Sequence, residues 1–275
     1  MNTLEFSHFL TWHGPCFEGV SDPFHYLYFW RIHMHRVPLK FLFVALVAAV
    51  PAWAQAQLSA NVALTTNYKF RGQDQDVNRI KAVNPAIQGG FDYTFGESGF
   101  YVGNWNSSVD WLSGNSIEVD FYGGYKFAAG GLDWDVGALT YVYPGNSNGN
   151  TTELYGSGTY GPVTVKYSHT VSDDYFGWAG AKSSSLSGRN TGYLNVAFAH
   201  EIAPATTLKA AVGYTRFASD IKDLGVPNYV DYSVGAAYDF GSGLVLNGAI
   251  QGATKKGYFG DANKARLIVS ISKTL

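Results

Sequence analysis

Charged side chains recur at every second position in several stretches of this sequence. Glu118 and Asp120 flank Val119, and Asp133 and Asp135 flank Trp134. Alternate residues of an extended strand point to the same side, so each pair of carboxylates shares one face. The same pattern recurs along the chain, and it predicts a set of charges that point from the polar faces of successive strands toward the inside of the fold. They are Lys69, Arg71, Asp92, Asp110, Glu118, Asp120, Lys126, Asp135, Glu153, Lys166, Asp231 and Arg266. Rings of such charges select ions in a pore.

The balance of these inward charges is acidic. With Asp133, Glu201 and Asp239 included, the set holds ten acids and five bases, and acidic linings favour cations. A weak preference for cations is one hypothesis; the other is that the charges pair across strands and fill the interior. Tyrosines on the same face indicate a narrow passage for ions or small polar solutes. They are Tyr122, Tyr141, Tyr143, Tyr155, Tyr193 and Tyr229.

Nucleophilic catalysis is a second class of function, in which a serine and a histidine within hydrogen-bond reach would hydrolyse a substrate. After residue 56 only His169 and His200 remain, and they fall near opposite ends of their predicted strands. Ser168 and Thr170 flank His169, so they point to the opposite face. No Gly-x-Ser-x-Gly motif stands on a strand-to-helix turn. The sequence therefore predicts no enzyme, with a non-conducting structural or lipid-modifying barrel as the alternative.

A hairpin from Ile117 to Tyr143 shows how these side chains are positioned. Its first arm alternates apolar and polar residues, Ala128 to Gly131 form a turn, and its second arm alternates again from Leu132 to Val142. This period of two is typical of a strand with one apolar face. Roughly 9–11 residues are what a tilted strand needs to cross a bilayer, so the hairpin predicts two transmembrane β-strands.

From Leu58 to the C-terminus, the chain repeats the strand pattern of this hairpin. Longer loops follow odd-numbered strands and tight turns follow even-numbered ones, as in bacterial outer-membrane barrels. The fold class is therefore all-β, an antiparallel up-and-down transmembrane barrel of twelve strands, with a soluble sandwich or lipocalin-like barrel as the alternative. The first strand is expected to run from Leu58 to Arg71. The third is expected to face Trp105 outward and Asn104 and Asn106 inward.

The N-terminal region is expected to lie outside this fold. Met34 to Lys40 is basic, residues 41–50 are apolar, and small-x-small cleavage sites end at Ala54 and Ala56, which predicts a signal peptide at 34–56. Residues 1–33 are interpreted as a mis-assigned extension, and 57–275 as the barrel. The alternative, a membrane anchor, needs a longer apolar run.

The mature chain offers no chemistry for disulfides, thiolate metal sites or nucleic-acid binding. The single cysteine, Cys16, precedes the cleavage site, and the formal net charge of the chain is −2 at pH 7. No metal, cofactor or nucleic-acid partner is therefore predicted.

Several motifs of the mature chain resemble those of one bacterial family. They include Tyr68-Lys69-Phe70-Arg71-Gly72, Glu118-Val119-Asp120-Phe121-Tyr122-Gly123-Gly124-Tyr125, Tyr143-Pro144-Gly145, Asn228-Tyr229-Val230-Asp231-Tyr232 and Val269-Ser270-Ile271-Ser272-Lys273-Thr274-Leu275. The chain resembles the TorF family of porins, also named Gcw_chp, whose substrate is not established.

The resemblance covers nearly the whole mature chain and implies a barrel in the bacterial outer membrane. The expected partners are outer-membrane lipid and lipopolysaccharide, small solutes or ions, and the barrel-assembly machinery through the C-terminal strand. Such barrels usually end in an aromatic residue, whereas this chain ends in Leu275.

Overall fold

The structure, a computed structural model, describes residues 58–76, 83–180 and 185–275. All of them belong to one compact unit, residues 50–275. The predicted extension 1–33 and signal peptide 34–56 lie outside the described residues.

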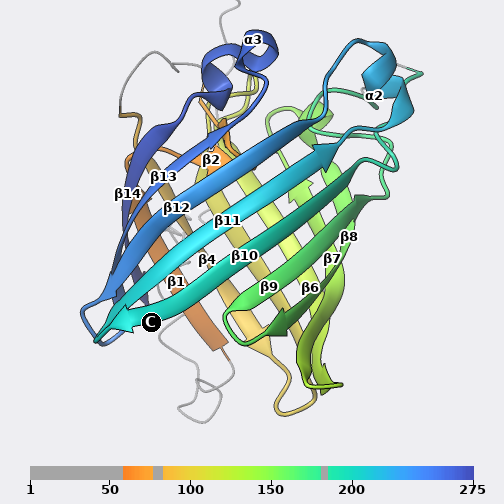
Figure 1. Ribbon diagram of the computed structural model, residues 1–275. Coiled ribbons are helices and arrows are strands. Elements are labelled where there is room, and N and C mark those ends of the chain that lie inside the picture. The colour runs from red at the N-terminus through yellow and green to blue at the C-terminus, as the bar shows by residue number, and fades with distance from the viewer. Residues whose placement is uncertain (1–57, 77–82, 181–184) are drawn as a thin grey trace, which may run out of the picture. The chain divides into compact units, whose positions relative to one another are not determined.

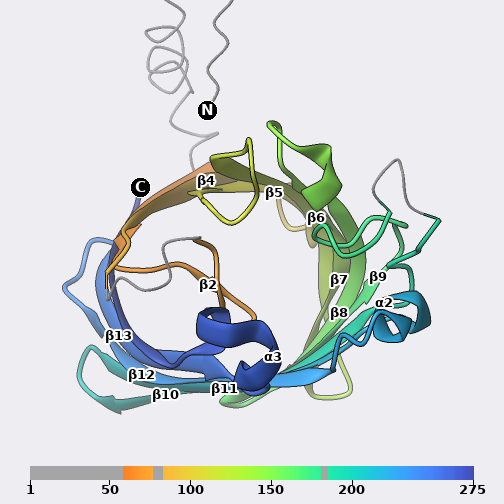
Figure 2. The same cartoon turned by 90° about the horizontal axis from the view of Figure 1, so that it is seen from above.

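Twelve antiparallel strands form a closed barrel, each paired with its neighbours in the sequence. The ring closes where β1 pairs with β14, from Asn61–Thr274 to Thr65–Ser270 (Figures 1 and 2). The barrel strands are β1 (Leu58–Thr65), β4 (Ala86–Thr94), β5 (Phe100–Ser108), β6 (Ile117–Ala129), β7 (Leu132–Val142), β8 (Thr151–Tyr160), β9 (Val163–Thr170), β10 (Gly192–Ala203), β11 (Thr206–Arg216), β12 (Tyr229–Asp239), β13 (Leu244–Ala253) and β14 (Arg266–Thr274). The predicted fold class and strand number are confirmed.

Connections differ between the two ends of the barrel. At one end, here the turn end, tight turns join the strands; Gly130 and Gly131 link β6 to β7, both with the positive φ that two-residue hairpin turns require. The other, here the loop end, carries the longer connections and their short helices. These helices are η2 (Ser147–Gly149), α2 (Ser219–Asp223), α3 (Lys256–Phe259) and η3 (Gly260–Asn263). Among the described residues, no helix is long and apolar enough to cross a membrane.

The barrel carries its apolar residues outside and its charges inside. Leu64, Phe121 and Leu267 are 57%, 55% and 66% exposed, whereas Glu118 and Glu153 on the inner face are each 1% exposed. A soluble sandwich or lipocalin-like barrel would bury its apolar face. A closed barrel with an apolar outer wall fits a lipid environment instead.

Strand β5 has the opposite orientation to the predicted one. The Trp105 ring points inward and lies 5.6 Å from the ring of Tyr68 in an edge-on contact. Asn104 and Asn106 lie on the outer face, where their amides donate to the backbone carbonyls of Asp120 and Gly89 at 2.9 and 3.2 Å. These hydrogen bonds satisfy the amide groups, so polar residues can occupy this face.

The inward tyrosines lie against glycines of the neighbouring strands. A Cβ atom added at Gly124 would lie 2.7 Å from the Tyr101 hydroxyl, and one at Gly137 would lie 2.5 Å from that of Tyr155. Gly103 and Gly213 are covered in the same way, by Tyr122 and Tyr193. The rings therefore occupy space that side chains would otherwise fill on the next strand.

The first loop-end connection folds into the barrel, which corrects the predicted first strand. β1 ends at Thr65, and the chain then forms a small hairpin of β2 (Lys69–Phe70) and β3 (Gln73–Asp74). Seen from the loop end, β2 lies inside the ring of strands (Figure 2). Residues 66–76 are called the inward loop below.

Candidate functional site

Buried ion pairs hold the inward loop to the barrel wall. Arg71 Nη2 lies 2.6 Å from Glu153 Oε2 on β8. Asp74 pairs with Lys69 of the loop itself at 3.0 Å and with Arg266 on β14 at 2.7 Å. Because β8 and β14 are distant in the ring (Figure 1), the loop is fastened at two separate places. It therefore constricts the lumen.

Carboxylates gather on the wall that faces the inward loop. Glu118 accepts hydrogen bonds from the hydroxyls of Tyr68 at 2.9 Å and Tyr143 at 2.7 Å. Asp120, two residues further along β6, is also buried, and its Oδ1 has no hydrogen-bond partner among the described residues. Together with Glu153, these carboxylates make the constriction acidic.

A chamber of about 510 Å³ occupies the lumen between the constriction and the turn end. Tyrosines hold two of its carboxylates: Tyr101 donates to Asp135 and Tyr122 donates to Asp92, both at 2.6 Å. Three carboxylates and two ammonium groups line the chamber, so acidic groups outnumber basic groups in its lining. The lining residues are Ser59, Asp92, Thr94, Tyr101, Asp120, Tyr122, Lys126, Asp135, Leu139, Tyr155 and Lys166.

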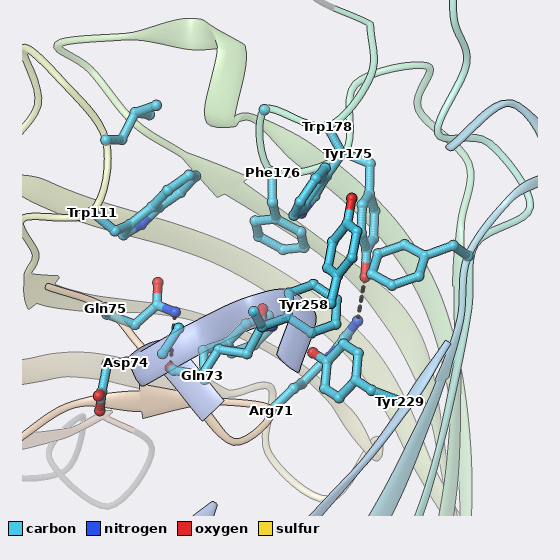
Figure 3. A pocket seen from close by; sticks show the side chains of 16 residues that line it. Arg71, Gln73, Asp74, Gln75, Trp111, Tyr175, Phe176, Trp178, Tyr229 and Tyr258 are labelled. Atoms are coloured by element: carbon cyan, nitrogen blue, oxygen red, sulfur yellow. Dashed lines mark hydrogen bonds between the residues drawn. The ribbon is translucent and has the colours of Figure 1, made fainter. Parts of the chain in front are cut away.

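A second cavity, of about 460 Å³, lies at the loop end (Figure 3). The inward loop meets the aromatic residues of the later loops there; Arg71 Nη1 donates to the Tyr175 hydroxyl at 3.4 Å. Burial raises the pKa of Tyr175 to about 12, so its phenol stays neutral at ordinary pH. The lining residues are Phe70, Arg71, Gln73, Asp74, Gln75, Trp111, Leu112, Tyr175, Phe176, Gly177, Trp178, Phe217, Tyr229, Tyr258, Phe259 and Ala262.

The structure places the predicted inward charges in three groups. Lys69 and Arg71 lie on the inward loop and not on a barrel strand. Asp110 lies beyond β5 on an exposed segment, where its backbone bridges to Asp76. The other nine lie on the inner face of barrel strands: Asp92, Glu118, Asp120, Lys126, Asp135, Glu153, Lys166, Asp231 and Arg266.

The two remaining histidines lie apart. His169 is on β9 near the loop end, with its ring nitrogens 3.3 Å from the Tyr167 hydroxyl and 3.2 Å from Asn190 Oδ1. His200 is on β10 toward the turn end and lies beside Phe198. The contacts of His169 are to a phenol and an amide and not to a serine, so they do not form a nucleophile–base pair.

Sequence reasoning missed the aromatic residues of the loop-end cavity. Phe176, Trp178 and Tyr258 stand in connections, where no period of two assigns a face. The one available signal was the density of aromatic residues in polar loops, such as Tyr175-Phe176-Gly177-Trp178.

Solved structures share this architecture at low sequence identity. The "KdgM porin" matches at 10% identity, with a TM-score of 0.50, over 78% of this chain and 98% of that chain. A "NanC porin" structure matches at 11% identity, with a TM-score of 0.51, over the same shares. These likenesses show the fold, a closed porin-like barrel. No curated protein matches the sequence.

The sequence itself matches a family model over residues 49–274, well over half of the chain, which include all twelve barrel strands. The family is described as "Bacterial protein of unknown function (Gcw_chp)". On this match, the chain belongs to the Gcw_chp family.

Proposed function

We propose that this protein is an outer-membrane channel for the passive diffusion of small cations and small polar solutes. The observation that carries the proposal is the closed twelve-stranded barrel with an apolar outer wall and an interior cavity lined by more carboxylates than ammonium groups. Eight-stranded barrels are filled by side chains, and barrels of 16–18 strands hold wide channels. Twelve strands and one inward loop fit a narrow passage.

The orientation follows from the two kinds of connection. Outer-membrane barrels place short turns in the periplasm and longer loops outside the cell. The turn end, where the first and last strands also begin and end, is therefore the periplasmic side. The loop end, with its aromatic cavity, faces the exterior.

Export to this membrane is proposed to follow cleavage of a signal peptide after Ala56, with translation starting at Met34. The basic, apolar and small-residue segments at 34–56 support this. N-terminal sequencing of the protein from outer membranes should give Gln57 as the first residue. A precursor with blocked processing should begin at Met34, and one beginning at Met1 would overturn the start.

The cation preference follows from charges left without a counter-charge. Arg71, Arg266 and Lys69 are engaged in ion pairs with Glu153 and Asp74. Within the turn-end chamber carboxylates outnumber ammonium groups, so cations are attracted into it more strongly than anions.

The test is single-channel recording of the protein purified from outer membranes, in a planar bilayer with a KCl gradient. Discrete current steps and a reversal potential shifted toward that of K⁺ are expected. Asp92→Asn with Asp135→Asn should reduce the shift, whereas Asp223→Asn, at an exposed position of helix α2, should leave it unchanged. Higher permeability to Cl⁻ would overturn the cation preference, and a folded protein without current would favour a non-conducting structural barrel.

A further inference from the structure

We infer that the loop-end cavity binds a neutral saccharide, which it holds at the outer mouth of the barrel. The binding of the sugar rests on the cavity alone, whereas its onward passage rests on the channel proposed above. A volume of about 460 Å³ is within the range of cavities that enclose a small ligand.

Aromatic rings face the cavity from opposite sides. Trp111 stands on one side, and Phe176 and Trp178 stand on the other (Figure 3). Each of these three side chains keeps part of its surface exposed, and Phe176 and Trp178 pack against a buried cluster that includes Tyr175 and Phe217. Flat aromatic faces carry partial negative charge and attract the C–H groups on the face of a pyranose ring.

The charges of the cavity are already neutralised by the protein. Arg71 and Asp74 are its charged lining residues. Arg71 is paired with Glu153, and Asp74 is paired with Lys69 and Arg266. A charged ligand would have to lose its hydration without gaining a counter-ion, so the cavity disfavours sugar acids and amino sugars relative to neutral sugars.

Neutral polar groups remain available for hydroxyl groups. Gln73 Nε2 donates to Asn263 Oδ1 at 2.9 Å, and Gln75 Nε2 donates to the carbonyl oxygen of Gln73 at 3.2 Å. Both amides are thereby fixed by their nitrogens, and the oxygen of Gln75 points up into the cavity (Figure 3). Trp111 Nε1 is buried and has no acceptor among the described residues. Amide acceptors between aromatic faces match a polyhydroxylated ring.

The test measures binding separately from conduction. Isothermal titration calorimetry of the full detergent-solubilised protein would use cellobiose as the neutral probe, digalacturonate as the acidic probe and toluene as the apolar probe. Cellobiose should bind at least about tenfold more tightly than either of the others, because only it offers both apolar ring faces and uncharged hydroxyls.

Variants locate the binding to the cavity. Trp178→Ala should weaken cellobiose binding by about tenfold. Trp178→Phe should keep most of the wild-type affinity, because an aromatic ring remains at this position. Trp134→Ala is the matched control, since Trp134 lies at the turn end of β7, and it should leave binding unchanged. If Trp178→Ala does not fold, Gln75→Ala, on the polar side of the cavity, gives the second measurement, again with weaker binding expected.

The outcomes for the sugar and for the channel are distinguishable. Cellobiose binding without any current would support this site and overturn the proposed channel. Current steps without cellobiose binding, or with tighter binding of digalacturonate or toluene, would overturn this site and leave the channel standing. An equal loss of binding in Trp178→Ala and Trp134→Ala would also overturn it.

Discussion

Breaking the Arg71–Glu153 ion pair should loosen the inward loop and change ion selectivity in a direction that depends on which partner is removed. The two side chains are 6% and 2% exposed, and their charged atoms lie 2.6 Å apart. At an effective dielectric constant of about 20, the attraction at this distance is about 6 kcal/mol. The cost of burying each ion offsets much of it, so the net contribution of the pair is small.

Removing one partner has a larger effect than the pair's net contribution, because the other charge stays buried without a counter-ion. Arg71→Met and Glu153→Gln should each lower the free energy of unfolding by about 3–5 kcal/mol. The double variant should lose less than the sum of the two, since neither charge remains. Urea unfolding of the protein in detergent, followed by tryptophan fluorescence, gives the three values and the coupling between them.

Selectivity separates the two single variants. Arg71→Met leaves the Glu153 carboxylate without its counter-charge beside the lumen and should increase the preference for K⁺ in a KCl gradient. Glu153→Gln leaves the guanidinium and should decrease it. If both variants lose less than about 1 kcal/mol, the pair behaves as a solvated surface pair and the reasoning fails; a shift of selectivity in the same direction for both would refute it as well.

Two further predictions concern the wall and an outer loop. Gly90→Ala places a Cβ against the backbone carbonyl of Asn104, whereas at Gly248 nothing lies within 4 Å. Gly90→Ala should therefore destabilise the barrel by about 1–3 kcal/mol or more, and Gly248→Ala should not. The measurement is the temperature at which the band of the folded barrel is replaced by that of the unfolded chain on a gel. The Ser187 hydroxyl and the Arg189 guanidinium hold the pKa of Asp173 below its usual value. Their contact with Asp173 therefore stabilises the loop fully above the ordinary aspartate pKa, and this stabilisation is lost as pH falls through the lowered pKa of Asp173. Hydrogen exchange at residues 185–191, corrected for intrinsic rates, should become faster as pH falls through that lowered pKa. In Asp173→Asn it should already be faster at pH 7.

The strands with a clean separation of apolar and polar residues were predictable. In β6 the alternation is unbroken, in β7 only Leu139 and Thr140 interrupt it, and the structure gives the predicted faces. β5 has aromatic residues on both faces and asparagines whose amides bond to neighbouring carbonyls. Its alternation therefore carried no information on which face was outside, and the choice of face was wrong.

The inward loop could not be predicted from periodicity for a related reason. Tyr68 and Phe70 continue the alternation of β1, so the first strand was extended to Arg71. The bend after Thr65 depends on contacts with residues far away in the sequence, such as Glu118 and Glu153. The aromatic cavity depends on the same long-range contacts, because several loops must converge before it exists.

The tyrosines that cover glycines also have a consequence for how the lumen of the barrel could change over evolutionary time. The width of the lumen near Tyr101 depends on Gly124 one strand away, and that near Tyr155 depends on Gly137. A methyl group at either glycine would displace the ring into the passage, whereas loss of the ring would uncover the backbone beside the glycine. The tyrosine and the glycine of such a pair are therefore expected to change together, so the width of the lumen evolves through paired substitutions on adjacent strands.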